Sequence, residues 1–182
     1  MNYHNITHDD MLNGSGFRVV LWCSGCEHHC HNCQNPQTWN INSGIPFDKQ
    51  AKEELFSELS KDYISGLTLS GGDPLHENNL QTVLDLVNKI SISFPQKTIW
   101  IYSGYTWKGV MNPVITTDFN PDRDKIIKMR QEIVKQCDVF VDGRYIDELR
   151  DVTLHWKGSS NQRVIDVQKS LKEGKVILFD DK

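Results

Sequence analysis

FRVVLWCSGCEHHCHNC, residues 17–33, carries both a fold signal and a chemical signal. Its first seven residues are mostly apolar and rich in β-forming side chains, which predicts a buried strand over 17–23. No segment resembles a secretion signal, so we expect a cytoplasmic protein whose thiols stay reduced. Crowded cysteines in a reducing compartment favour a metal site over disulfides. Four of the five cysteines lie within eleven residues here: Cys23, Cys26, Cys30 and Cys33.

Strand-like and helix-like patterns alternate after this segment. Helices are predicted over 48–61 and 78–92. A third begins where Asn120 can cap it and Pro121 suits its first position. Such alternation implies right-handed crossovers, so we expect an α/β fold with mostly parallel strands. The further strands are predicted over 66–70, 98–102, 138–142, 163–167 and 175–179.

The carboxyl ends of the predicted strands carry the unusual residues of the chain. In parallel α/β folds, binding sites gather at that edge of the sheet. We therefore expect the chemistry of this protein on one edge. Besides the cysteines, the strand ends hold Gly71-Gly72-Asp73, Ser103-Gly104 and Asp142-Gly143.

Size and charge limit the class of protein. The 182 residues, 38% hydrophobic and 24% charged, suit one domain spanning 1–182. The net charge of −4 gives no electrostatic reason to expect nucleic acid or an anionic membrane surface as a partner. No apolar run approaches the roughly 20 residues that span a bilayer.

The spacing Cys26-x3-Cys30-x2-Cys33 leaves three explanations open. A structural zinc site takes four closed ligands, and four cysteines so near in sequence would crowd one ion. Bacterial ferredoxins use a different order of spacings, with proline after the last ligand. The third explanation is a four-iron cluster that is held by three cysteines and keeps one iron open for a substrate.

Two cysteines and three histidines are expected outside the ligand set. Cys23 shares a strand face with Val19 and Leu21, which predicts packing at the strand end. Cys137 continues an apolar helical stripe and is interpreted as a core thiol. The histidines are interpreted as exposed loop residues that contact a partner or tune the cluster by hydrogen bonds: His28, His29 and His31.

The cysteine spacing resembles the signature of the radical S-adenosylmethionine (SAM) enzymes. SGGDPL, residues 70–75, follows a predicted strand and resembles the glycine-glycine-acid motif of that family. The resemblance implies a [4Fe-4S] cluster whose open iron binds SAM and whose electron cleaves it to a 5′-deoxyadenosyl radical. It assigns the iron to Cys26, Cys30 and Cys33. It assigns the SAM amino group to the turn Gly71, Gly72 and Asp73.

Longer segments narrow the resemblance to the activating proteins of anaerobic ribonucleoside-triphosphate reductases. It implies an oxidoreductase that forms a glycyl radical on the reductase large subunit and draws its electron from a low-potential donor. Two alternatives stay open: an activase of another glycyl radical enzyme, of the formate-lyase type, and a non-catalytic zinc-binding module. The segments are NGSGFRVVLWCSGC (13–26), GLTLSGGDPL (66–75), IWIYSGY (99–105), DVFVDGRYI (138–146) and GSSNQRVIDV (158–167).

The resemblance also implies an architecture. A full (β/α)8 barrel needs roughly 250 residues. This shorter chain is therefore expected to form an incomplete β/α barrel of the radical SAM type, open on one side. An open side suits a protein segment as substrate better than a small molecule.

Several residues near this edge have roles that the motifs leave open. Radical SAM loops often carry an aromatic residue before the third cysteine, where this chain has Asn32, with Gln34 after the cysteine. We expect adenine contacts from these two. Contacts with SAM or the partner, or plain turn and surface roles, are open for Asp142, Arg144, Ser159, Ser160, Asn161 and Arg163.

The remaining expectations concern tryptophans and one long connection. The segment 108–120 is interpreted as a surface insertion or as part of the interface with the reductase. Core or interface positions, without a catalytic role, are expected for Trp22, Trp39, Trp100 and Trp156.

Overall fold

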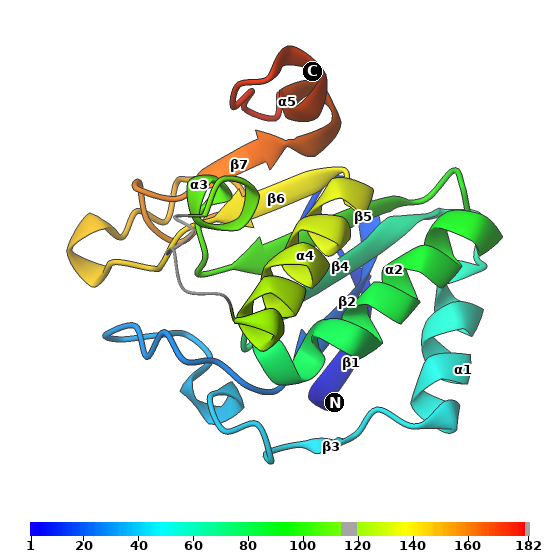
Figure 1. The fold of residues 1–182 in the computed structure, drawn as a ribbon. Coiled ribbons are helices and arrows are strands. Elements are labelled where there is room, and N and C mark those ends of the chain that lie inside the picture. Colours follow the sequence, from blue (N-terminus) through cyan, green and yellow to red (C-terminus); the bar gives the residue numbers. More distant parts are fainter. Residues whose placement is uncertain (114–119, 181–182) are drawn as a thin grey trace.

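A computed structural model describes residues 1–113 and 120–180 (Figure 1). Within them, one seven-stranded sheet has the order β3-β1-β2-β4-β5-β6-β7. Its centre is parallel, as predicted, and consists of β2 (Phe17–Cys23), β4 (Ile64–Gly71), β5 (Thr98–Ser103) and β6 (Val139–Asp142). The flanking strands pair antiparallel: β1 (Asn2–Asp10), β3 (Ile45–Pro46) and β7 (Arg163–Asp166).

The long helices cover one face of the sheet (Figure 1). They are α1 (Lys49–Leu59), α2 (Leu80–Ser93) and α4 (Pro121–Gln136). Shorter helices are α3 (Trp107–Met111) and α5 (Val167–Glu173), and 3-10 turns span Pro36–Thr38, Glu77–Asn79 and Asp147–Leu149. No helix in the described ranges is long and apolar enough to cross a membrane.

The predicted helix starts are confirmed by their caps. Asp48 accepts a hydrogen bond from the Ala51 N–H at the start of α1, and Asn120 accepts one from Arg123 before α4. Each cap satisfies a backbone N–H that has no partner within its helix. The apolar stripe of α1 is buried at Ala51, Leu55 and Leu59.

Two predictions about strands differ from the structure. Residues 175–179 form no strand and contribute only an isolated bridge between Leu178 and Ile165. The N-terminal segment, which its polar composition left without a predicted element, forms β1, with Tyr3 and Ile6 buried. The strand β1 pairs antiparallel with β2, although its own apolar alternation is weak.

Part of the long connection also has regular structure. Trp107–Met111 forms α3, with Trp107 and Val110 buried against the core. Residues 114–119 lie outside the described ranges. The interpretation of 108–120 as an insertion or an interface segment therefore stays a prediction.

The main core lies between the sheet and its helices. Cys23 packs there with Val19 and Leu21, and Cys137 is buried in the same cluster, which confirms both as core thiols. A smaller apolar cluster on Trp100, Val139 and Val141 includes Trp156 and Phe179. The Trp100 ring lies edge to face with both of those rings, so aromatic contacts attach the C-terminal segment to this cluster.

The parallel register brings the strand ends together. Cys23 pairs with Gly71 across β2 and β4, and Ser103 pairs with Asp142 across β5 and β6. The cysteine loop and the 143–162 segment project from this same side of the sheet (Figure 1). The prediction that these residues share one edge is confirmed.

Candidate metal centre and cofactor cavity

A cavity of about 430 Å³ opens at the carboxyl ends of the parallel strands. Cys26, Cys30 and Cys33 all contribute to its wall. The glycine turn at 71–72, the end of β5 at 103–104 and the segments 143–145 and 154–162 supply much of the rest. The strand ends set this position, because each loop leaves the sheet at the same edge.

The three thiols have the surroundings that cluster ligands need. All three are free and partly exposed. Cys33 Sγ accepts the Asn35 N–H at 3.4 Å, and backbone hydrogen bonds from His28 and Tyr145 reach Cys26 and Cys30. Backbone N–H groups directed at sulfur stabilise thiolates and tune the potential of iron–sulfur clusters.

Burial of the thiols disfavours their charged form unless a positive centre is bound. Burial raises the pKa of Cys26 to about 11, against the effect of the His28 N–H. Burial also raises the pKa of Cys30, which the Tyr145 N–H and the Arg144 charge partly offset. A bound metal centre deprotonates such thiols through its own charge.

The donor set on this wall consists of three cysteine thiols. Among the described side chains, no group of three or more His, Cys, Asp or Glu is placed to hold one metal ion. Cys23 gives no fourth ligand, because it is fully buried in the core, where burial raises its pKa to about 12. Three cysteine thiols on one cavity wall supply the soft sulfur donors that iron–sulfur clusters use.

The glycine turn packs directly against the start of the cysteine loop. The Gly72 N–H donates to the Cys23 carbonyl at 2.8 Å, and the Asp73 N–H donates to the Gly25 carbonyl at 2.7 Å. Gly71 has φ +102°, and a Cβ on Gly72 would lie 2.5 Å from the Gly25 oxygen. Both positions require glycine for backbone packing, and both residues line the cavity.

Asp73 is buried behind the wall and is not a lining residue. Its Oδ2 accepts hydrogen bonds from His28, Ser103 Oγ and the Gly104 N–H at 2.8–3.0 Å, and its Oδ1 accepts the Leu75 N–H at 2.8 Å. The carboxylate is thus occupied by protein donors. Its direct contact with an amino group, implied by the motif, stays a prediction, and the structure gives Asp73 a second task in joining three segments of the wall.

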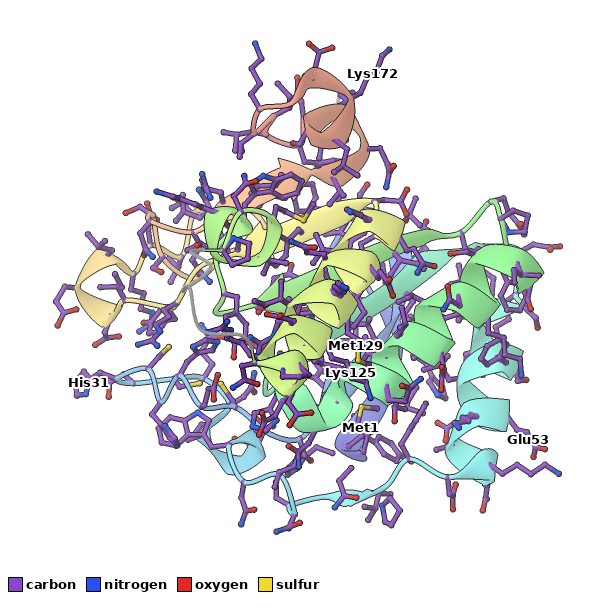
Figure 2. All side chains as sticks on the ribbon, viewed as in Figure 1. Met1, His31, Glu53, Lys125, Met129 and Lys172 are labelled. Atoms are coloured by element: carbon purple, nitrogen blue, oxygen red, sulfur yellow. The ribbon has the colours of Figure 1, made fainter. Side chains whose placement is uncertain are left out.

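The prediction that His28 is an exposed loop residue is wrong. Its side chain is 4% exposed and lines the cavity, whereas His29 and His31 are exposed as expected. His31 projects outward from the loop (Figure 2). The buried position of His28 depends on Gly104, where a Cβ would lie 2.2 Å from His28 Cδ2. Sequence spacing carries no signal for this contact, because 76 residues separate the two.

The two predicted adenine contacts differ in position. Gln34 lies on the cavity wall. Asn32 is exposed and donates to Asp147 Oδ2 at 2.7 Å, outside the wall, so its contact with adenine stays a prediction. Sequence reasoning missed Asn35, which follows the third cysteine and lines the cavity.

Asp142 at the end of β6 and Arg163 at the start of β7 contact each other. Asp142 is buried and pairs with Arg163 through Nε at 3.0 Å and a terminal nitrogen at 2.5 Å. Its Oδ2 also accepts the Trp107 N–H. This ion pair joins β6 to β7. Neither Asp142 nor Arg163 lines the cavity.

The segment 158–162 is folded around Gln162, a residue that the motifs did not single out. Gln162 Oε1 accepts the N–H groups of Gly158 and Ser159, and its amide donates to the Gly143 carbonyl. Ser159 is buried, while Ser160 and Asn161 are exposed. Arg144 is exposed on the cavity wall beside Gln162.

Three buried polar atoms on wall residues have no hydrogen-bond partner in the described part of the chain. They are His28 Nδ1, Trp39 Nε1 and the Tyr102 hydroxyl. The protein shields these atoms, and burial without a partner costs free energy. The three thiols on the same wall are the groups that suit an iron–sulfur cluster. Of the tryptophans, Trp22, Trp39 and Trp156 line this cavity, and Trp100 is in the core.

Comparison with known proteins first defines the class. Residues 12–165 match the family model described as a 4Fe-4S single cluster domain. The chain, which has three free thiols at one cavity of its α/β fold, therefore belongs to the class of iron–sulfur proteins with a single 4Fe-4S cluster domain.

Curated relatives define the particular family. Over 166 residues the chain is 38% identical to the anaerobic ribonucleoside-triphosphate reductase-activating protein of Escherichia coli K12, covering 90% of this chain and 97% of the relative. The protein of the same name from Enterobacteria phage T4 is 40% identical over 164 residues, with 90% and 93% covered. That from Vibrio cholerae is 37% identical, with 89% and 96% covered. The chain belongs to this family of activating proteins.

Proposed function

We propose that this protein is a radical SAM oxidoreductase that places a glycyl radical on anaerobic ribonucleoside-triphosphate reductase. The observation that carries the proposal is a cavity whose wall includes both three free thiols and a glycine turn. Family membership supports the choice of target, since the relatives are named for activating that reductase.

Each wall element has a task in this proposal. Cys26, Cys30 and Cys33 hold three irons of a [4Fe-4S] cluster. Gly71 and Gly72 bring backbone close to the SAM amino group, and Asp73 acts by fixing their turn. Gln34 and Asn35 are the wall residues beside the third thiol and are the candidates for adenine contacts.

The reaction requires little acid–base chemistry from the protein. When bound, the cluster supplies one electron that breaks a sulfonium C–S bond of SAM, and the adenosyl radical released takes a hydrogen atom from the target glycine. The chain binds, orients and shields these groups. A low-potential donor must restore the electron, and a reducing compartment such as the cytoplasm suits the cluster.

We further propose that the sheet is an incomplete β/α barrel of the radical SAM type, within one domain spanning 1–182. The parallel centre with helices on one face supports this, as does the position of the cavity at the carboxyl ends. Away from the thiols, the wall includes Leu12, Trp22, Leu154 and Trp156. Such apolar side chains suit a segment of the reductase as substrate.

Anaerobic reconstitution tests the proposal. The wild-type protein, with SAM and a strong reductant, should form 5′-deoxyadenosine and hold about four irons per chain, as expected for a [4Fe-4S] site. Cys26→Ala, Cys30→Ala and Cys33→Ala should each abolish both. Cys23→Ala and Cys137→Ala are the matched controls and should retain the cluster. A colourless protein with one zinc would contradict the proposal and restore the zinc-module alternative.

The choice of target needs a separate measurement. The activated protein is mixed with the reductase or with a formate-lyase-type enzyme, and electron paramagnetic resonance detects the glycyl radical. We expect the signal with the reductase alone. A signal only with the second enzyme would replace the target and leave the cluster chemistry unchanged.

A further inference from the structure

Arg18 is a fully buried arginine on the face of the sheet opposite the long helices. The next residue, Val19, packs in the main core under the helices, and successive side chains of a strand point to opposite faces. Within the described residues, the Arg18 guanidinium donates five hydrogen bonds at 2.6–3.2 Å, all to uncharged oxygen atoms. Every N–H donor of an arginine is thereby used, so this side chain holds protein groups and leaves no donor for a ligand.

Two of these hydrogen bonds reach the loop 11–16, which connects β1 to β2. One is direct, from a terminal nitrogen of Arg18 to the Ser15 carbonyl at 3.2 Å. The other passes through Thr68 of β4. Arg18 Nε donates to the Thr68 hydroxyl at 2.6 Å, and that hydroxyl donates to the Asn13 carbonyl at 2.8 Å. Because an N–H only donates and a carbonyl only accepts, the direction of both bonds is fixed.

The loop packs closely against the arginine. Gly14 has φ +139°, and a Cβ on it would lie 2.5 Å from Arg18 Cδ. Glycine therefore lets the loop backbone lie directly on the side chain. Farther along β1, Asp10 Oδ1 accepts the N–H groups of Leu12 at 2.9 Å and Asn13 at 2.7 Å. The loop is thus held both from the sheet and from its own beginning.

The loop held in this way is part of the cavity wall. Leu12 and Asn13 line the cavity that the three thiols also line, and Leu12 is 81% exposed. We propose that Arg18 is a positioning residue for the reaction, which acts through Thr68 to hold the loop 11–16 where Leu12 meets the entering segment of the reductase. This inference rests on the proposed function, in which that segment brings the target glycine to the cavity.

Two threonines allow a matched comparison. Thr68 and Thr98 each accept a hydrogen bond from the Arg18 guanidinium. The Thr68 hydroxyl then donates to the Asn13 carbonyl of the loop, whereas the Thr98 hydroxyl donates to the Ser65 carbonyl of β4. Thr68→Val and Thr98→Val therefore each remove one bond to the arginine and one bond to a carbonyl. Only Thr68→Val removes a bond to the loop.

The first measurement does not depend on activity. The full-length variants are reconstituted anaerobically, and hydrogen exchange of the peptide that contains the loop 11–16 is followed by mass spectrometry. We expect Thr68→Val to exchange about 10-fold faster there, the effect of losing one buried hydrogen bond, and Thr98→Val to keep the wild-type rate. Thr68→Ser restores the hydroxyl and should restore the rate. Equal exchange in the two valine variants would overturn the inference, because Arg18 would then support the sheet as a whole.

The second measurement separates positioning from stability. Glycyl radical formation is followed by electron paramagnetic resonance at increasing concentrations of the reductase. We expect Thr68→Val to raise the KM for the reductase about 10-fold and to leave kcat near the wild-type value, because the loop contributes to binding of the protein substrate. Thr98→Val should keep the wild-type KM. An unchanged KM in Thr68→Val would overturn the inference. So would weaker SAM binding by Thr68→Val, because the loop would then serve the cofactor.

A surface variant covers the case in which Thr68→Val folds poorly. Leu12 is 81% exposed and Ile92, on α2, is 82% exposed, so truncation of either side chain leaves the core intact. Leu12→Ala should raise the KM for the reductase, whereas Ile92→Ala should not. Equal KM values for these two variants would overturn the inference. A wild-type protein that holds no cluster, or that activates a different enzyme, would instead contradict the proposed function, and the exchange result would still decide whether Arg18 and Thr68 hold the loop.

Discussion

Two buried aspartates at the carboxyl edge of the sheet are satisfied in different ways. Asp142, at the end of β6, pairs with the Arg163 guanidinium of β7 and accepts one backbone N–H. Asp73, just after β4, accepts one imidazole, one hydroxyl and two backbone N–H groups. The first carboxylate thus has its charge partner on the next strand, and the second collects donors from several segments.

The two carboxylates therefore differ in what they connect: Asp142 joins neighbouring strands, whereas Asp73 joins several segments of the cavity wall. The Asp142 pair joins two adjacent strands and lies behind the cavity wall. Asp73 joins the cysteine loop through His28 and the end of β5 through Ser103 and Gly104, all of which line the wall. Damage at Asp73 should therefore spread to the cofactor site, whereas damage at Asp142 should remain local.

Asp73→Ala should have the largest effect. It leaves the donors of His28, Ser103, Gly104 and Leu75 without an acceptor in the protein interior. We expect the free energy of unfolding to fall by about 4 kcal/mol, as when one partner of a buried charged network is removed. Chemical denaturation measures the loss, and iron content after reconstitution should fall with it. Full iron retention would show that Asp73 does not support the cofactor site.

Gly104→Ala should follow, because its Cβ would occupy space taken by the His28 ring. Overpacking of this kind costs roughly 2–3 kcal/mol. The decisive measurement is a double-mutant cycle with His28→Ala. In that background the imidazole ring is absent, so the new Cβ at position 104 has nothing to clash with. The two changes should be strongly non-additive, whereas additive losses would mean that Gly104 matters for another reason.

Asp142→Asn should cost less. The amide keeps one acceptor for Trp107 or Arg163, and the Arg163 side chain is 40% exposed and can be hydrated. We expect a loss of about 1.5 kcal/mol in the free energy of unfolding. SAM affinity and iron content should equal those of the wild type. A drop in either quantity would show that Asp142, like Asp73, supports the cofactor site.

Gly143→Ala should have the smallest effect of the four. Gly143 has φ +100°, which disfavours a side chain, but the nearest atom to an added Cβ is 3.9 Å away. Backbone strain alone predicts about 1 kcal/mol. Thermal unfolding of Gly143→Ala and Gly104→Ala is compared. The first variant measures backbone strain, and the second measures a steric clash. A larger loss for Gly143→Ala would reverse that assignment.

The comparison also shows where sequence reasoning was sufficient. The cysteine spacing and the glycine turn lie within short segments, and the predicted strands before them are confirmed as β2 and β4. Parallel alternation then placed both at one edge without further information. The caps at Asp48 and Asn120 were readable for the same reason, because a cap is a contact between near neighbours.

Where prediction failed, distant residues decided the outcome. The exposed loop neighbours of His28 predict a surface position, but the side chain is buried against Asp73 and Gly104. The strand β1 has few apolar residues and forms by pairing with β2. Residues 175–179 have a strand-like composition, yet they follow α5 and make one bridge only.

By itself, the sequence determined the parallel centre of the sheet, its three long helices, the three thiols and the edge at which they gather, because periodicity and spacing act over a few residues. Only the tertiary structure decided that the Asp73 carboxylate accepts protein donors, that Asp142 pairs with Arg163, and that His28 is buried against Asp73 at the cavity wall. These depend on side chains far apart in the chain, whose meeting follows from the packing of the loops over the strand ends.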